Sequence, residues 1–210
     1  MTRIILRIIV AAILVVAFAS AVVAIYAKAT GLSARATPST VEASAARAVR
    51  SFAVPGAMKD RRSPVAASGD VLAEGLAHYA DHCASCHGND GSGNTEMGRG
   101  LFPGVPDMRL PPTQELSDGE LFYIIENGVR FTGMPAWSTG TADGEASTWH
   151  LVQFIRHLPK LTPDEVMRME ALNPRSPDAI RQEIEEEQFL QGGDTSTPVP
   201  STTSPHAGAH

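Results

Sequence analysis

The stretch Cys83-Ala84-Ser85-Cys86-His87 contains both cysteines of this 210-residue chain and places a histidine directly after the second. Two cysteines three positions apart on a helical turn lie near one edge of a planar group, and the next residue can turn beneath that group. C-x-x-C-H is the attachment signature of a c-type haem. The pentapeptide predicts one covalent haem c, attached through Cys83 and Cys86, with His87 as a ligand of the iron.

Two other chemistries can use the same cysteines. A redox-active disulfide between Cys83 and Cys86 is typical of thioredoxin-like proteins, but no strand-rich βαβ pattern precedes the pair. A structural zinc ion usually needs four cysteine or histidine ligands in paired clusters, and no second cluster follows. His78 and His82 lie close by on the predicted helix, and we expect both to face solvent. The pattern therefore favours haem attachment.

The segment from about residue 68 predicts a helix that runs into the motif, with Ser68 or Asp70 as its capping residue. Gly75 and Tyr79 lie four positions apart on this helix. A glycine removes the side chain where two helices cross, and an aromatic ring can fill the gap that remains. The apolar periodicity of this segment by itself predicts an amphipathic helix of any kind.

A second motif, Gly133-Met134-Pro135-Ala136-Trp137, lies in a predicted loop, and its methionine follows His87 by 47 positions. A thioether is a soft, neutral ligand that suits haem iron, and Met/His ligation raises the reduction potential. With the pentapeptide and the helical pair, this motif resembles the class I c-type cytochromes. The resemblance implies that Met134 is the distal ligand opposite His87, whereas Met97 and Met108 are less favoured ligands.

The resemblance covers about residues 68–160. It implies an all-α fold, the class I cytochrome c fold, in which a small helical domain surrounds one covalent haem. It also implies that the glycine and the aromatic residue pack on a C-terminal helix. Residues 148–158 have the apolar stripe of such a helix, and we expect Leu151 and Phe154 at the contact.

Further residues have roles that the resemblance implies but does not assign uniquely. A proline carbonyl accepts the hydrogen bond of the proximal histidine in the family, and both Pro103 and Pro106 are candidates here. Arg99 and Arg109 could neutralise the haem propionates, or they could be solvated surface charges. Both alternatives remain open at this stage.

Between the two motifs, Ser117 and Glu120 form the pattern of a capping box, followed by apolar residues at helical spacing. Asn127-Gly128 predicts the end of this helix. The sequence thus predicts a helix that leads directly into the loop of Met134.

Residues 4–27 predict a transmembrane anchor, because Ile8 to Ala27 are twenty consecutive uncharged residues. A cleaved signal peptide is the alternative, since small residues suit cleavage after Ala19 or Ala29. The uncharged run exceeds the hydrophobic region of a signal peptide, which favours an uncleaved anchor. The resemblance implies a single-pass protein of the inner membrane, with the haem domain on the periplasmic or outer face.

The rest of the chain predicts less structure. Residues 28–67 have the composition of a flexible linker, within which residues 42–52 could hold a short helix. As a flexible coil, these forty residues would have a root-mean-square end-to-end distance of about 35 Å. Residues 161–192 predict acidic helices with proline and acidic residues in their first turns. Residues 193–210 are polar, and we expect them to be disordered.

The net charge is −6, and no basic folded face suggests nucleic acid. The resemblance implies a carrier that moves single electrons between redox partner proteins, not an enzyme, since a cytochrome c peroxidase would have two haem motifs. The alternatives are a gas-binding or sensing protein with a displaceable sixth ligand, and a haem subunit of an oxidoreductase complex. Neither the partners nor the potential can be derived from the sequence.

Overall fold

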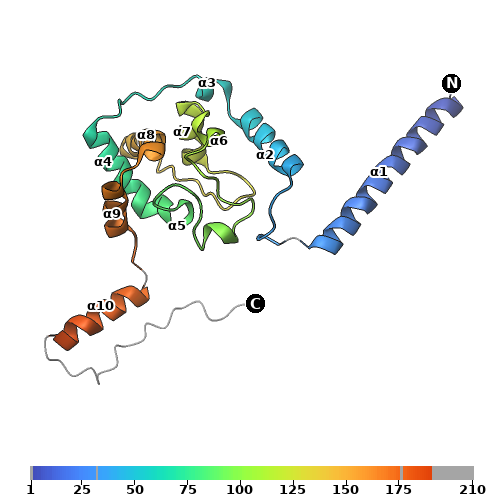
Figure 1. Ribbon diagram of the computed structural model, residues 1–210. Helices are drawn as coiled ribbons and strands as arrows, with labels where there is room; N and C mark the ends of the chain where they lie inside the picture. The colour runs from blue at the N-terminus through green and yellow to red at the C-terminus, as the bar shows by residue number, and fades with distance from the viewer. Residues whose placement is uncertain (1, 32, 176, 191–210) are drawn as a thin grey trace. The chain divides into compact units, whose positions relative to one another are not determined.

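The computed structural model describes residues 2–31, 33–175 and 177–190, and every regular element within these ranges is a helix (Figure 1). This confirms the predicted all-α class. In chain order the elements are α1 Thr2–Thr30, α2 Thr40–Ala53, α3 Gly56–Lys59, α4 Gly69–His78, the π-helical turn η1 Tyr79–Cys83, α5 Ala84–His87, the 3-10 turn η2 Gly98–Gly100, α6 Pro111–Gln114, α7 Asp118–Asn127, α8 Ala142–His157, the 3-10 turn η3 Leu158–Lys160, α9 Pro163–Leu172 and α10 Pro177–Leu190.

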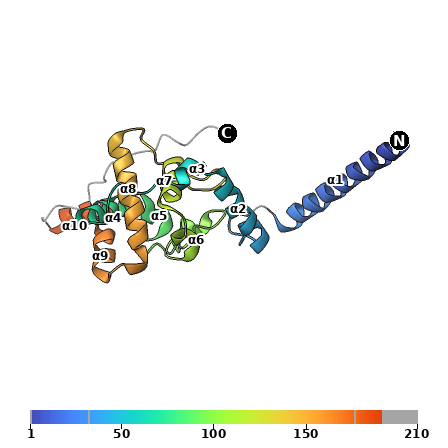
Figure 2. The ribbon, with the colours of Figure 1, turned by 90° about the horizontal axis from the view of Figure 1, so that it is seen from above.

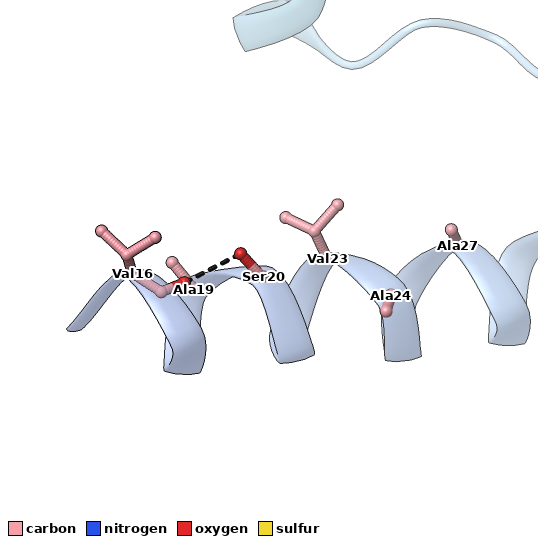
Figure 3. A pocket seen from close by; sticks show the side chains of 6 residues that line it. All are labelled: Val16, Ala19, Ser20, Val23, Ala24 and Ala27. Carbon is pink, nitrogen blue, oxygen red and sulfur yellow. Dashed lines mark hydrogen bonds between the residues drawn. The ribbon is translucent and has the colours of Figure 1, made fainter. Parts of the chain in front are cut away.

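Helix α1 has the length and composition of a membrane span. Its segment Arg3–Ala29 is strongly apolar, and none of it is buried within the protein. Small residues leave a shallow groove along one side, where the hydroxyl of Ser20 donates to the carbonyl of Val16 at 2.8 Å (Figure 3). That bond satisfies the hydroxyl within the helix, as an apolar surrounding requires. The helix is therefore long and apolar enough to cross a bilayer.

The core of the helical domain is built on the packing of α4 against α8, which lie side by side in both views (Figures 1 and 2). The predicted close crossing is present: a Cβ added at Gly75 would lie 2.7 Å from the Cβ of Phe154. The ring of Tyr79 contacts the ring of Phe154, with 5.2 Å between centroids. Leu151 is buried as expected. The pair Gly75 and Tyr79 thus has the packing role that the sequence predicted.

The caps of these helices are mostly the predicted ones. Ser68 accepts from the amide of Val71 at the start of α4, and the capping box of Ser117 and Glu120 starts α7. Helix α8 starts earlier than the apolar stripe suggested, because Thr141 caps it. Its first turn is polar, so the apolar periodicity gave no sign of it.

Within the segment predicted as a linker, residues 28–67, helix α2 corresponds to the short helix considered for residues 42–52. The residues after α2 pack on the domain: Val54 is buried, and Met58 and Val65 contact the core. The guanidinium of Arg61 lies 4.6 Å from the centre of the Phe122 ring, beside Trp149. Single apolar residues between prolines have no periodicity, so their packing left no pattern in the sequence.

The helices predicted for residues 161–192 correspond to α9 and α10. Helix α9 contacts α4 and η1, and its Met169 is completely buried in the core. The folded domain therefore extends beyond residue 160. Helix α10 belongs to a separate unit that begins at Asn173, in which Arg175 pairs with Glu183. The predicted disordered tail, residues 193–210, lies outside the described residues.

Candidate haem site

Cys83, Cys86 and His87 lie on one continuous helical segment, formed by η1 and α5 directly after α4. In the π-helical turn η1, the amide of Ala84 donates to the carbonyl of Tyr79. A turn of this type adds one residue to a helix, and it is frequent at functional sites. The added residue rotates all side chains that follow, so the pentapeptide faces a different direction from the one an unbroken α-helix would give it.

Both cysteines are free thiols whose side chains are partly buried. Burial raises the pKa of Cys83 to about 12, and the nearby Cys86 contributes to the same shift. A thiol with a raised pKa is a poor nucleophile in disulfide exchange. The described residues also contain no group of three or more metal-binding side chains. These observations disfavour the redox disulfide and the zinc site.

His87 is the partly buried imidazole of the motif. Burial lowers its pKa to about 4, so the ring is neutral at pH 7. Its Nδ1 is buried without a hydrogen-bond partner among the described residues. The bond predicted from Nδ1 to the carbonyl of Pro103 or Pro106 is therefore not formed. A neutral imidazole has a lone pair available for a metal ion.

The glycine-rich loop after His87 folds back on the motif. The amide of Gly93 donates to the carbonyl of His87 at 2.7 Å, and the hydroxyl of Tyr79 donates to the carbonyl of Gly88 at 3.0 Å. Gly88 and Gly93 have φ angles of +75° and +73°, which glycine adopts most easily. A turn this tight keeps the chain beside His87.

The two arginines considered as propionate partners are both engaged within the protein. Arg109 pairs with Asp107 at 2.7 Å and with Asp90 at 3.1 Å, and the side chain of Arg99 donates to Asn94 at 2.9 Å. The hydrogen bond from Arg109 lowers the pKa of Asp107. Arg109 thus joins the loop after His87 to the segment before α6.

Met134 lies in a loop that is folded tightly against the end of α7. The amide of Val129 donates to the carbonyl of Met134 at 3.1 Å, and the amide of Trp137 donates to the carbonyl of Ile125 at 3.1 Å. Gly128, with a φ angle of +65°, allows this return, because a Cβ there would lie 2.6 Å from the carbonyl oxygen of Met134. The side chain of Met134 is partly buried.

The loop of Met134 contacts residues that flank the haem motif at two places. First, the ring of Trp137 stacks on the ring of His82, the residue before Cys83, with centroids 5.4 Å apart and an interplanar angle of 23°. Second, Gly133 packs against the side chain of Leu101, at the end of η2. The structure therefore joins the two motifs, although 47 positions separate His87 from Met134.

Turn η2, which directly precedes Leu101, also packs against the backbone of Cys86. A Cβ added at Gly98 would lie 2.6 Å from the carbonyl oxygens of Cys86 and Gly93. Beside it, the sulfur of Met97 lies 3.3 Å from the sulfur of Cys86. Met97 is thus on the Cys86 side of the motif.

Sequence reasoning missed these supporting residues. His82 is exposed, as expected, but its stacking on Trp137 was not predicted. Gly98 was missed because the loop contains many glycines that look alike in sequence. The only available signal was the position of Trp137, three residues after Met134 in a motif already identified.

Two reduced thiols and a neutral, partly buried imidazole on one helical segment fit a covalently attached haem c, because they are the groups that its attachment and ligation require. Residues 70–155 match a family described as cytochrome C oxidase, cbb3-type, subunit III. The match includes the pentapeptide and the loop of Met134. A comparison with curated proteins finds no match.

Proposed function

We propose that residues 70–155, which match a cytochrome c oxidase subunit family, form a class I c-type cytochrome domain, and that the protein is a membrane-tethered, mono-haem electron carrier. Cys83 and Cys86 hold one haem c covalently, and His87 and Met134 bind its iron. When bound, the haem supplies a one-electron couple between ferric and ferrous iron. The chain contributes the attachment, the two ligands and a packed surrounding.

One observation carries the proposal: both thiols and a neutral imidazole lie on the helical segment η1–α5, which the core holds in place. Tyr79 is completely buried at the start of this segment, and Ala84 is buried within it. The burial of these two residues fixes the direction of the segment within the helical domain, so that the two thiols and the imidazole are presented together.

The assignment of Met134 as the sixth ligand rests on the two contacts of its loop with residues that flank the haem motif. The stack of Trp137 on His82 and the packing of Gly133 on Leu101 support a position of the loop next to the motif. A six-coordinate iron has no open position for a substrate, so electron transfer is the function that this ligand set favours.

We also propose that α1 anchors the protein in the cell membrane as a single span, with the haem domain on the periplasmic or outer face. The strongly apolar segment Arg3–Ala29 supports the span. The side of the membrane follows from the chemistry of the motif, since c-type attachment in related families takes place on that face. Redox partners in or near the same membrane would then be within reach.

A second candidate function is suggested by the description of the matched family, which names a subunit of an oxidase. The domain could pass electrons as one subunit of such a complex instead of as a free carrier. Solubilisation in mild detergent followed by size-exclusion chromatography distinguishes the two. A complex subunit elutes with other haem- or metal-containing chains, whereas a free carrier elutes alone.

Visible spectra of the purified full-length protein in both redox states test the proposal. We expect the spectrum of a low-spin c-type haem that acidified acetone does not extract, and no haem stain after denaturing electrophoresis of the variant with Cys83→Ala and Cys86→Ala. Haem that the solvent extracts from the wild type contradicts covalent attachment. Rapid binding of carbon monoxide by the ferrous wild type would favour the sensing function.

A further inference from the structure

Helix α2 has an apolar face that no other part of the described chain covers (α2 in Figure 1). None of its residues is buried, and the side chains of Val41, Val49 and Phe52 are 76%, 66% and 91% exposed. Val41, Ala45, Ala48 and Phe52 follow one another at helical spacing, so they form a single stripe. A stripe of this kind on a helix of a water-soluble domain would normally face the core.

The opposite face of α2 is basic and is turned toward the domain. Arg50 on this face is partly buried, and Glu120 is the carboxylate whose charge acts on it. The amine of Lys59 donates to the hydroxyl of Ser51 at 3.3 Å. The next residue after the helix, Val54, is buried in the domain. The apolar stripe therefore points away from the domain.

The connection between α1 and α2 limits how far the apolar stripe of α2 can lie from the end of α1. Helix α1 ends at Thr30 and α2 begins at Thr40. Even fully extended, the connecting residues 31–39 span about 30 Å. If α1 crosses a membrane, α2 must remain close to the surface of that membrane.

We propose that α2 lies in the interface of the membrane that α1 spans, with Val41, Ala45 and Phe52 among the lipid chains and its basic face toward the haem domain. The inference rests on the anchoring that we propose for α1. An amphipathic helix with a low overall hydrophobicity and an aromatic residue on its apolar face is typical of interfacial helices. The stripe is small, but the tether to α1 raises its effective concentration at the surface, so weak insertion is sufficient.

This position of α2 limits how far the haem domain can move from the membrane. A flexible linker of forty residues would have a root-mean-square end-to-end distance of about 35 Å and could extend further. With α2 in the interface and Val54 buried in the domain, only a few residues separate the bilayer from the folded core. The domain is then held close to the membrane surface, where it can exchange electrons with partners that are embedded in the same membrane.

The test uses the full-length holoprotein in vesicles of phosphatidylcholine and phosphatidylglycerol. A nitroxide is attached at Ala45→Cys, in the centre of the stripe, and in a matched variant at Ser44→Cys, its neighbour on the polar side. Cys83 and Cys86 are linked to the haem, so only the added thiol reacts. With the haem reduced and diamagnetic, relaxation of each label is measured with oxygen, which enters lipid, and with a water-soluble nickel chelate, which does not.

We expect oxygen to relax the label at position 45 several-fold more than the chelate does, and the reverse at position 44. Adding Val41→Glu and Phe52→Glu to the Ala45→Cys variant should make position 45 accessible to the chelate. Equal accessibility of both positions to the chelate, or protection of position 45 from both reagents, would overturn the inference. Flotation of the same vesicles tests α1 separately, because a protein anchored by α1 floats with the lipid whatever the position of α2.

Discussion

Gly75 lies directly against Phe154 where α4 crosses α8: a Cβ at position 75 would be 2.7 Å from the Cβ of Phe154 and would overlap the backbone carbonyl of His150. Any residue other than glycine at position 75 would therefore overlap atoms of α8. The next turn of α4 supplies Tyr79, whose ring fills the space beside Phe154. The crossing therefore fixes the helix that continues into Cys83, Cys86 and His87.

Replacing the glycine at the crossing should destabilise the domain. We expect Gly75→Val to lower the free energy of unfolding of the holoprotein by about 1–3 kcal/mol, because the added side chain forces α4 and α8 apart. Gly69→Val is the matched control, since a Cβ at Gly69, in the same helix, meets no atom within 4 Å. Denaturant unfolding followed by circular dichroism measures both. Equal losses in the two variants would mean that the crossing is not the cause.

Removing the thioether should change the spectrum and the potential. We expect Met134→Ala to abolish the sulfur–iron charge-transfer band at the red edge of the ferric spectrum, to open the ferrous iron to carbon monoxide and to lower the reduction potential. The variant should also loosen the loop that ends at Trp137, because the iron no longer ties it down.

The other two methionines considered as ligands provide the controls. Met97→Ala and Met108→Ala should both keep the charge-transfer band, since the sulfur of Met97 lies beside Cys86 and Met108 is buried in the core. A band that survives in Met134→Ala and disappears in one of the control variants would assign the ligand to that methionine instead.

The stack between Trp137 and His82 should stabilise the loop of Met134. We expect Trp137→Ala to weaken this loop by about 0.5–1.5 kcal/mol, so that the charge-transfer band is lost at a lower temperature than the helical circular dichroism. Phe131→Ala is the control, because Phe131 lies in the same loop but is 93% exposed. If both variants lose the band at the wild-type temperature, the stack has no role in holding the loop.

Acid should weaken the loop after His87 through Asp107. The hydrogen bond from Arg109 holds the pKa of Asp107 below its ordinary value of 3.8. A group with a depressed folded-state pKa stabilises the fold above the unfolded pKa and loses this contribution as the pH falls through the folded pKa. The difference in denaturant midpoint between wild type and Asp107→Asn should therefore be constant above about pH 5 and shrink below pH 3.8. A difference that grows as the pH falls would contradict this.

The apolar segment of α1 predicts that the mature protein stays with membranes after a carbonate wash, since removing a span of this length from lipid is very unfavourable. Immunoblotting of the pellet and N-terminal sequencing of the mature protein measure the outcome. A mature N-terminus at Ser20 or Thr30, with the protein released by the wash, would show that the segment is a cleaved signal. A truncation that removes residues 2–30 should release the haem domain in either case.

Several parts of the fold could be predicted because a local pattern specifies them. The capping box of Ser117 and Glu120 and the end of α7 at Gly128 depend on residues within a few positions of one another. The packing of Val54, Met58 and Met169 on the domain depends on distant partners. The sequence around Val54 and Met58 has no apolar periodicity, and the pattern around Met169 predicted a helix without its partner. The sequence therefore predicted a linker and an additional helix where the structure has parts of the core.

The sequence by itself determined the chemical groups of the proposed site. Cys83, Cys86 and His87 lie within five residues, and Met134 lies in a second motif. Each of these residues carries its reactive group however the chain folds. Only the tertiary structure decided how the motifs meet, through the ring of Trp137 on His82 and the side chain of Leu101 against Gly133. The physical reason is that functional groups belong to single residues. A contact between residues far apart in the chain depends on the packing of all the helices between them, which no local pattern records.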